Sequence, residues 1–107
     1  MSFKEITVKE LKNKIDQDIE YQLIDVRELH EFQFANIGGE LIPMKTVKEK
    51  LDRIKRDIPV IIMCRSGKRS ADVIKMLQSD YGFENLFNLK GGILAWSDEI
   101  DPAIQKY

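Results

Sequence analysis

The spacing of apolar residues predicts helices and strands that alternate along the chain. Short apolar runs typical of strands occupy residues 21–26, 60–63 and 86–89, with a briefer apolar pair at 41–42. Helical spacing predicts helices at residues 8–17, 28–34 and 46–57, from about 70 to 81, and from the Gly91-Gly92 turn through Trp96. The alternation predicts an α/β fold whose parallel sheet carries helices on both faces.

Signals at the helix ends and along the helix faces support these assignments. Thr7 and Glu10 have the spacing of a capping box, with Thr7 as the N-cap. Gly82 suits a left-handed helix end, and Phe83 can make the hydrophobic contact that accompanies such an end. The buried face of the helix before Gly82 is predicted to comprise Val73, Ile74, Leu77 and Tyr81. The buried face of the 46–57 helix is predicted to comprise Val47, Leu51, Ile54 and Ile58.

Length and composition favour one folded domain over residues 1–107. Of the 107 residues, 43% are hydrophobic and 33% are charged, which is enough apolar surface for an ordinary core. A formal net charge of −1 gives no reason to expect a nucleic-acid partner. The longest apolar stretch, residues 60–64, is too short to span a membrane, and the N-terminus has no apolar region typical of a signal peptide. We therefore expect a cytoplasmic protein without a membrane partner.

The one cysteine, Cys64, limits the chemistry that the chain can perform. It cannot form an internal disulfide, a Cys-x-x-Cys redox pair or a cysteine-rich zinc site. We expect neither a metal ion nor another cofactor.

The surroundings of Cys64 predict a reactive thiol. The 60–63 strand leads through a polar loop into a helix, and parallel sheets place their functional loops at the carboxyl ends of the strands. The loop amides can form an anion-binding nest, for which Gly67 provides conformational freedom. Helix N-termini and nearby cations favour the nucleophilic thiolate. We therefore predict a catalytic Cys64 and a loop that binds an anionic substrate, formed by Arg65, Ser66, Gly67, Lys68 and Arg69. The alternative is a structural cysteine that closes a core strand beside a solvated basic loop.

Three motifs resemble those of single-domain rhodanese-like sulfurtransferases, which carry sulfane sulfur as a cysteine persulfide. The motifs are Cys64-x-x-Gly67-x-Arg69-Ser70, Leu23-Ile24-Asp25-Val26-Arg27-Glu28 with Glu31-Phe32 beyond it, and Gly91-Gly92-Ile93-x-Ala95-Trp96. The resemblance implies a five-stranded parallel sheet flanked by helices. It also implies that loop amides stabilise the thiolate and the persulfide. One departure is Asn36, which stands where the family usually has the His of Gly-His-Ile, and Asn36 can replace that His as a polar structural contact.

Loop length separates two chemistries of this fold. Phosphatases and arsenate reductases that resemble it have five residues between the Cys and the Arg. Here four residues separate Cys64 from Arg69. The shorter loop should crowd a phosphate over the sulfur, so sulfur transfer is favoured over phosphoryl transfer.

The other charged residues near the motifs are assigned by the chemistry that the reaction needs. Arg65 and Lys68 are candidates for binding an anionic donor, whereas Arg69 is expected to point into the fold and order the loop, through a carboxylate. Asp25, Arg27 and Ser70 are expected to give structural support, because an ionised thiol needs no general base. The single histidine, His30, is expected at the surface.

The predicted reaction is a two-step sulfur transfer through Cys64. The thiolate takes the outer sulfur of a small anionic donor such as thiosulfate, or of another persulfide. The Cys64 persulfide then passes this sulfur to cyanide, a thiol or a protein acceptor. With no second cysteine in the chain, the acceptor must come from outside. The alternative is a protein-partnered sulfur-relay module with little turnover of free thiosulfate.

Overall fold

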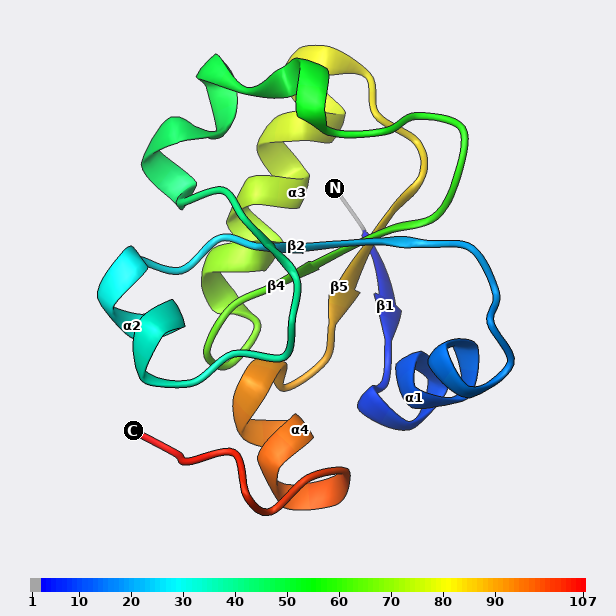
Figure 1. Cartoon of the computed structure of the whole chain (residues 1–107). Helices are drawn as coiled ribbons and strands as arrows, with labels where there is room; N and C mark the ends of the chain where they lie inside the picture. The colour runs from blue at the N-terminus through cyan, green and yellow to red at the C-terminus, as the bar shows by residue number, and fades with distance from the viewer. Residues whose placement is uncertain (1–2) are drawn as a thin grey trace.

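Five parallel strands form one sheet at the centre of the computed structural model, which describes residues 3–107 (Figure 1). The strand order is β1-β5-β4-β2-β3. The strands are β1 Lys4–Ile6, β2 Gln22–Asp25, β3 Glu40–Leu41, β4 Val60–Met63 and β5 Leu86–Leu89. The helices within the described residues are α1 Val8–Asp16, α2 Leu29–Phe34, α3 Lys68–Tyr81, α4 Gly92–Glu99, and the 3-10 helices η1 Met44–Glu49 and η2 Leu51–Arg53. The predicted five-stranded parallel α/β sheet is confirmed.

The alternation of side chains along β4 divides the core into two layers. Ile62 and Cys64 face the cluster that contains the apolar side chains of α3. Ile61 and Met63 face the opposite cluster, which contains the apolar side chains of α1 and α4. Figure 1 shows α3 on one side of the sheet and α1 and α4 on the other. Helices therefore cover both faces, as predicted, and the Cys64 side chain points towards the α3 layer.

Both predicted helix-end signals are confirmed. The Thr7 hydroxyl accepts from the Glu10 amide at 3.1 Å, and the Glu10 carboxylate accepts from the Thr7 amide at 2.9 Å. Gly82 ends α3 in a left-handed conformation, with φ at 69°. The Phe83 amide then donates to the Leu77 carbonyl, and the Phe83 ring is buried.

The predicted helix over residues 46–57 is wrong, because the segment forms η1 and η2 instead. Its amides donate to carbonyls three residues earlier, for example Lys50 to Val47 and Ile54 to Leu51. The segment returns from the end of β3 to the start of β4, and a 3-10 helix rises about 2.0 Å per residue against 1.5 Å for an α-helix. The apolar spacing fits both forms, since Val47 and Ile54 are still buried.

Three further details differ from the prediction. Helix α3 begins at Lys68, earlier than the position near residue 70 expected from the sequence. Tyr81, expected on the buried face of α3, is 36% exposed, because the buried Phe83 occupies the core beyond the helix end. The apolar pattern does not predict the edge strand β1, since only one of its residues, Ile6, is buried.

Candidate active site

Cys64 stands directly after β4, and the loop that follows curls around its sulfur. The amides of Gly67 and Ser70 donate to Cys64 Sγ at 3.1 and 3.4 Å. Gly67 has a φ of 103°, a left-handed conformation that turns the loop into α3. Cys64 itself is only 1% exposed. Two backbone donors aimed at one sulfur atom favour the anionic form of that sulfur.

The N-terminus of α4 holds the same loop from the other side. The amides of Ile93 and Leu94 donate to the carbonyls of Cys64 and Arg65 at 3.0 and 3.2 Å. Gly92 lies against these carbonyls with a φ of 57°. The sequence predicts only a turn at Gly91-Gly92 and misses this clamp. The signal available was the glycine pair itself, since a close backbone approach requires glycine.

Arg69 forms a bidentate ion pair with Glu31 of α2, with N–O distances of 2.7 and 2.9 Å. The bonds from Arg69 are the main cause that lowers the pKa of Glu31 to about 2. The same bonds raise the pKa of Arg69. A carboxylate contact for Arg69 was expected, but Glu31 was not among the predicted site residues, although it lies in the Glu31-Phe32 segment. The pair fixes α2 to the first turn of α3.

Asp25 and Arg27 form a fully buried ion pair beside Glu31. Arg27 Nη2 donates to Asp25 Oδ2 at 2.7 Å, and Arg27 Nη1 donates to the Tyr107 hydroxyl at 2.9 Å. The Tyr107 hydroxyl donates in turn to Glu31 Oε2 at 2.8 Å. Burial alone would lower the pKa of Arg27, but the bonds to Asp25 and Tyr107 leave it raised. This chain of contacts links the end of β2 to Glu31 and so to Arg69.

The remaining loop residues form the exposed rim around Cys64. Arg65, Ser66 and Lys68 are all exposed. Arg65 donates from Nε and Nη2 to a main-chain oxygen of Tyr107, and its guanidinium lies 5.1 Å from the centre of the Tyr107 ring. Lys68 begins α3. Arg65 and Lys68 thus give this loop two exposed cationic residues.

Buried polar side chains complete the site on the α3 side of the sheet. The Ser70 hydroxyl lies 3.3 Å from Cys64 Sγ and donates to Asn88 Oδ1. Asn88 Nδ2 donates to the Gly67 carbonyl at 3.0 Å. The sequence prediction does not include Asn88, yet a polar residue inside the apolar run Leu86-Phe87-Asn88-Leu89 was an available signal.

Two residues outside the loop behave as the sequence indicated. Asn36 donates to the Phe32 carbonyl at 3.0 Å and accepts from the Gly38 amide at 3.0 Å, so it makes polar structural contacts before β3. His30 is exposed on α2.

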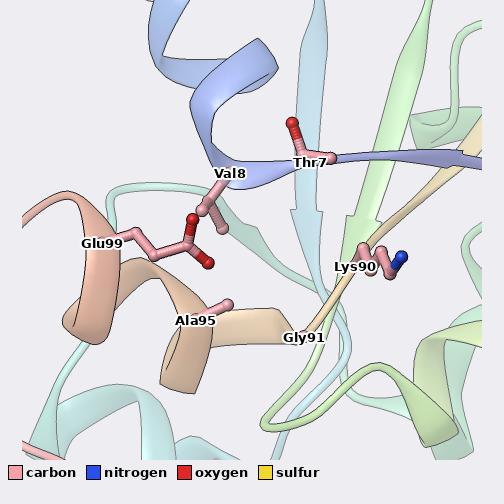
Figure 2. A pocket seen from close by; sticks show the side chains of 6 residues that line it. All are labelled: Thr7, Val8, Lys90, Gly91, Ala95 and Glu99. Carbon is pink, nitrogen blue, oxygen red and sulfur yellow. The ribbon is translucent and has the colours of Figure 1, made fainter.

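An open pocket of about 340 Å³ lies near the site but does not include Cys64. It is lined by the beginning of α1, by α4 and by the turn after β5 (Figure 2). Its lining residues are Thr7, Val8, Lys90, Gly91, Ala95 and Glu99. Within residues 3–107, no cluster of His, Cys, Asp and Glu side chains could hold a metal ion. In the same part of the chain, no helix is both long and apolar enough to cross a membrane.

The Glu31–Arg69 pair predicts a pH-dependent stability difference between the wild type and Glu31→Gln. The pKa of Glu31 lies below its usual 4.5, at about 2, so ionised Glu31 stabilises the folded state above pH 4.5. This contribution is lost as the pH falls through about 2. Urea unfolding should therefore show a less stable variant at pH 6 and a difference that shrinks below pH 4.5. Glu84→Gln, at an exposed position, is the control. A difference that stays constant with pH would contradict the prediction.

Fold and site together define a parallel α/β protein with a cysteine at a strand end, whose sulfur accepts from two amides of the loop that follows it. A family model described as "Rhodanese-like domain" matches residues 7–99. The Bacillus subtilis protein named "Putative sulfurtransferase YtwF" is 40% identical over 103 residues, which cover 95% of this chain and 98% of that protein. The structure of a rhodanese-like domain protein from Staphylococcus aureus is 34% identical, with a TM-score of 0.82, and covers 98% of this chain and 99% of that chain. The chain therefore belongs to the rhodanese-like domain family.

Some relatives are longer than this chain. The Bacillus subtilis protein named "Putative sulfur carrier protein YrkF" is 29% identical over 101 residues, which cover 94% of this chain and 54% of that protein. The chain thus spans about half the length of that relative.

Proposed function

We propose that the protein transfers sulfane sulfur through a persulfide on Cys64. The Cys64 thiolate attacks the outer sulfur of thiosulfate, the S–S bond of thiosulfate breaks, and sulfite leaves with the electron pair. An acceptor such as cyanide or a thiolate then attacks the outer sulfur of the persulfide, and Cys64 leaves again as a thiolate. No external oxidant or reductant is consumed. Membership of the rhodanese-like family and the relative named as a sulfurtransferase support this proposal.

One observation carries the proposal: the Gly67 and Ser70 amides both point at Cys64 Sγ. The same sulfur atom is the nucleophile in the first step and the leaving group in the second, and it is anionic in both roles. Fixed donors favour such an anion without having to reorganise during the reaction. A purely structural cysteine has no need of this arrangement.

The loop length favours sulfur transfer over phosphoryl transfer. Four residues separate Cys64 from Arg69, and Arg69 is engaged by both oxygens of Glu31. A phosphate over the sulfur would need a wider cradle and an arginine free to bind it in a bidentate manner. Efficient hydrolysis of an aryl phosphate by the wild type would reverse this preference.

Intact-mass spectrometry after incubation with thiosulfate tests the proposed function. The protein should gain the mass of one sulfur atom, and cyanide should remove this mass and yield thiocyanate. Protein whose thiol is first blocked with iodoacetamide is the control and should gain nothing. If folded, unblocked protein also shows no gain, Cys64 does not accept sulfur from thiosulfate.

A protein acceptor is the second candidate, in which the chain acts as a sulfur-relay module. A pocket of about 540 Å³ lies between η1 and α3, the helix that begins in the Cys64 loop. Met44, Val73 and Met76 give it an apolar lining, and the charged residues Lys45, Lys48 and Asp72 complete it. The relative named as a sulfur carrier agrees with such a role. A stable Cys64 persulfide with negligible steady-state thiocyanate production would favour the relay over the free-standing enzyme.

Neutralising the rim cations should weaken the binding of an anionic donor. In the variant Arg65→Gln/Lys68→Gln, the thiosulfate concentration for half-maximal persulfide formation should rise by roughly threefold to tenfold, because each exposed cation contributes up to about 1 kcal/mol. The rise should shrink as salt is added. Lys4→Gln/Lys55→Gln is the control. Both lysines are exposed and lie near the amino-terminal ends of the strands, whereas Cys64 lies at the carboxyl end of β4. Equal effects in both double variants would contradict a local role for the rim.

A further inference from the structure

Asn88 is a buried polar residue in the middle of the sheet. It pairs with Ile62 in the register between β4 and β5, so its side chain shares the α3-facing side of the sheet with Ile62 and Cys64. Only 3% of Asn88 is exposed. A buried amide in an apolar strand is costly unless its donors and acceptors are satisfied. Its contacts are therefore informative about why the position is polar.

The contacts of Asn88 determine where the Ser70 proton lies. Asn88 Nδ2 faces the Gly67 carbonyl at 3.0 Å, and a carbonyl can only accept, which fixes the orientation of the amide. Asn88 Oδ1 therefore faces the Ser70 hydroxyl, and the hydroxyl must donate. Its remaining lone pairs can accept from the Cys64 thiol 3.3 Å away. When Cys64 is an uncharged thiol, the thiol thus donates a hydrogen bond to the Ser70 hydroxyl, and this hydroxyl donates to Asn88 Oδ1.

An anionic Cys64 sulfur requires a different arrangement of the same three groups. The thiolate can only accept a hydrogen bond. The Ser70 hydroxyl has one proton, so it can donate either to Cys64 Sγ or to Asn88 Oδ1, but not to both. When it turns to the sulfur, it stabilises the anion but leaves Asn88 Oδ1 without its donor. Asn88 therefore competes with the sulfur for this hydrogen bond.

We propose that Asn88 is a positioning residue that acts through Ser70 and sets how readily the Cys64 sulfur becomes an anion. The inference rests on the proposed function, in which this sulfur is the nucleophile and then the leaving group. As the persulfide S–S bond breaks and the electron pair stays on Sγ, the Ser70 O–H turns from Asn88 to the sulfur. No proton leaves Ser70 in this step. In the persulfide, whose inner sulfur is uncharged, the hydroxyl returns to Asn88.

The test is the pH dependence of Cys64 alkylation by iodoacetamide, which needs no sulfur donor. Asn88→Ala removes the competing acceptor, so the midpoint of alkylation should shift to lower pH by about half a unit. Ser70→Ala removes the donor and should shift the midpoint upwards. In the Ser70→Ala background, Asn88→Ala should no longer lower the midpoint. Asn85→Ala is the matched control, because Asn85 also binds backbone carbonyls, those of Lys55 and Ile58, at the start of β5.

The sign of the shift separates this role from a structural one. If Asn88 only held the Gly67 carbonyl, its removal would loosen the loop amides around the sulfur and raise the midpoint. A raised midpoint, or an equal lowering with and without the Ser70 hydroxyl, would overturn the proposal. If Asn88→Ala does not fold, Asn88→Val fills more of the space without offering an acceptor to the Ser70 hydroxyl and gives the same comparison. Failure of thiosulfate to load Cys64 would contradict the proposed function alone, because alkylation reports on the sulfur directly.

Discussion

Replacing Cys64 by serine should abolish sulfur transfer while the fold stays intact. The serine hydroxyl can still accept from the Gly67 and Ser70 amides, so the free energy of unfolding should change by no more than about 1.5 kcal/mol. An alkoxide is not available at neutral pH and cannot carry a stable sulfane sulfur. Thiocyanate production from thiosulfate and cyanide should therefore fall to the rate without protein, and the mass should not increase.

The control for this variant is Ser79→Ala, a change at an exposed position on α3 outside the Cys64 loop. It should retain most of the activity and should still load sulfur. Residual turnover in Cys64→Ser at more than a few hundredths of the wild-type rate would show that sulfur passes by a route that does not use Cys64. Urea unfolding of both variants establishes that the comparison is between folded proteins.

Among the variants proposed for this protein, Gly92→Ala should cause the largest loss in the free energy of unfolding. A Cβ at this position would lie 2.5 Å from the Arg65 carbonyl oxygen and closer still to that of Cys64. Relief of this overlap requires the loop that follows Cys64 to move away from α4. Gly92 also has a φ of 57°, a conformation that disfavours alanine. Together the overlap and the backbone strain should lower the free energy of unfolding by about 2–5 kcal/mol.

Gly82→Ala separates the steric overlap from the backbone strain. Gly82 has a similar φ of 69°, but a Cβ there has no atom within 4 Å. Its replacement should cost only about 1–2 kcal/mol and leave persulfide formation intact. Gly92→Ala, where it still folds, should load sulfur more slowly than Gly82→Ala. Equal losses of stability in the two variants would contradict the role of Gly92 as the contact between α4 and the loop.

The local elements show which kinds of structure follow from neighbouring residues. The capping box at Thr7 and the left-handed end at Gly82 are short-range arrangements, and both were predictable. The segment over residues 46–57 was not, because its apolar spacing suits an α-helix and a 3-10 helix alike. The length that the segment must span between β3 and β4 is a property of the sheet.

The features of the candidate site also fall into those that depend on neighbouring residues and those that depend on the tertiary structure. The sequence by itself determined that Cys64 follows a strand and begins a basic loop, because these features depend on residues within a few positions of one another. It also determined the α/β class, because strands and helices alternate along the chain. Only the tertiary structure decided the partners from elsewhere: Glu31 on Arg69, Gly92 against the loop carbonyls, and Asn88 beneath Ser70. The physical reason is that hydrogen bonds and close packing depend on distance in space. The parallel sheet brings residues far apart in sequence to one edge.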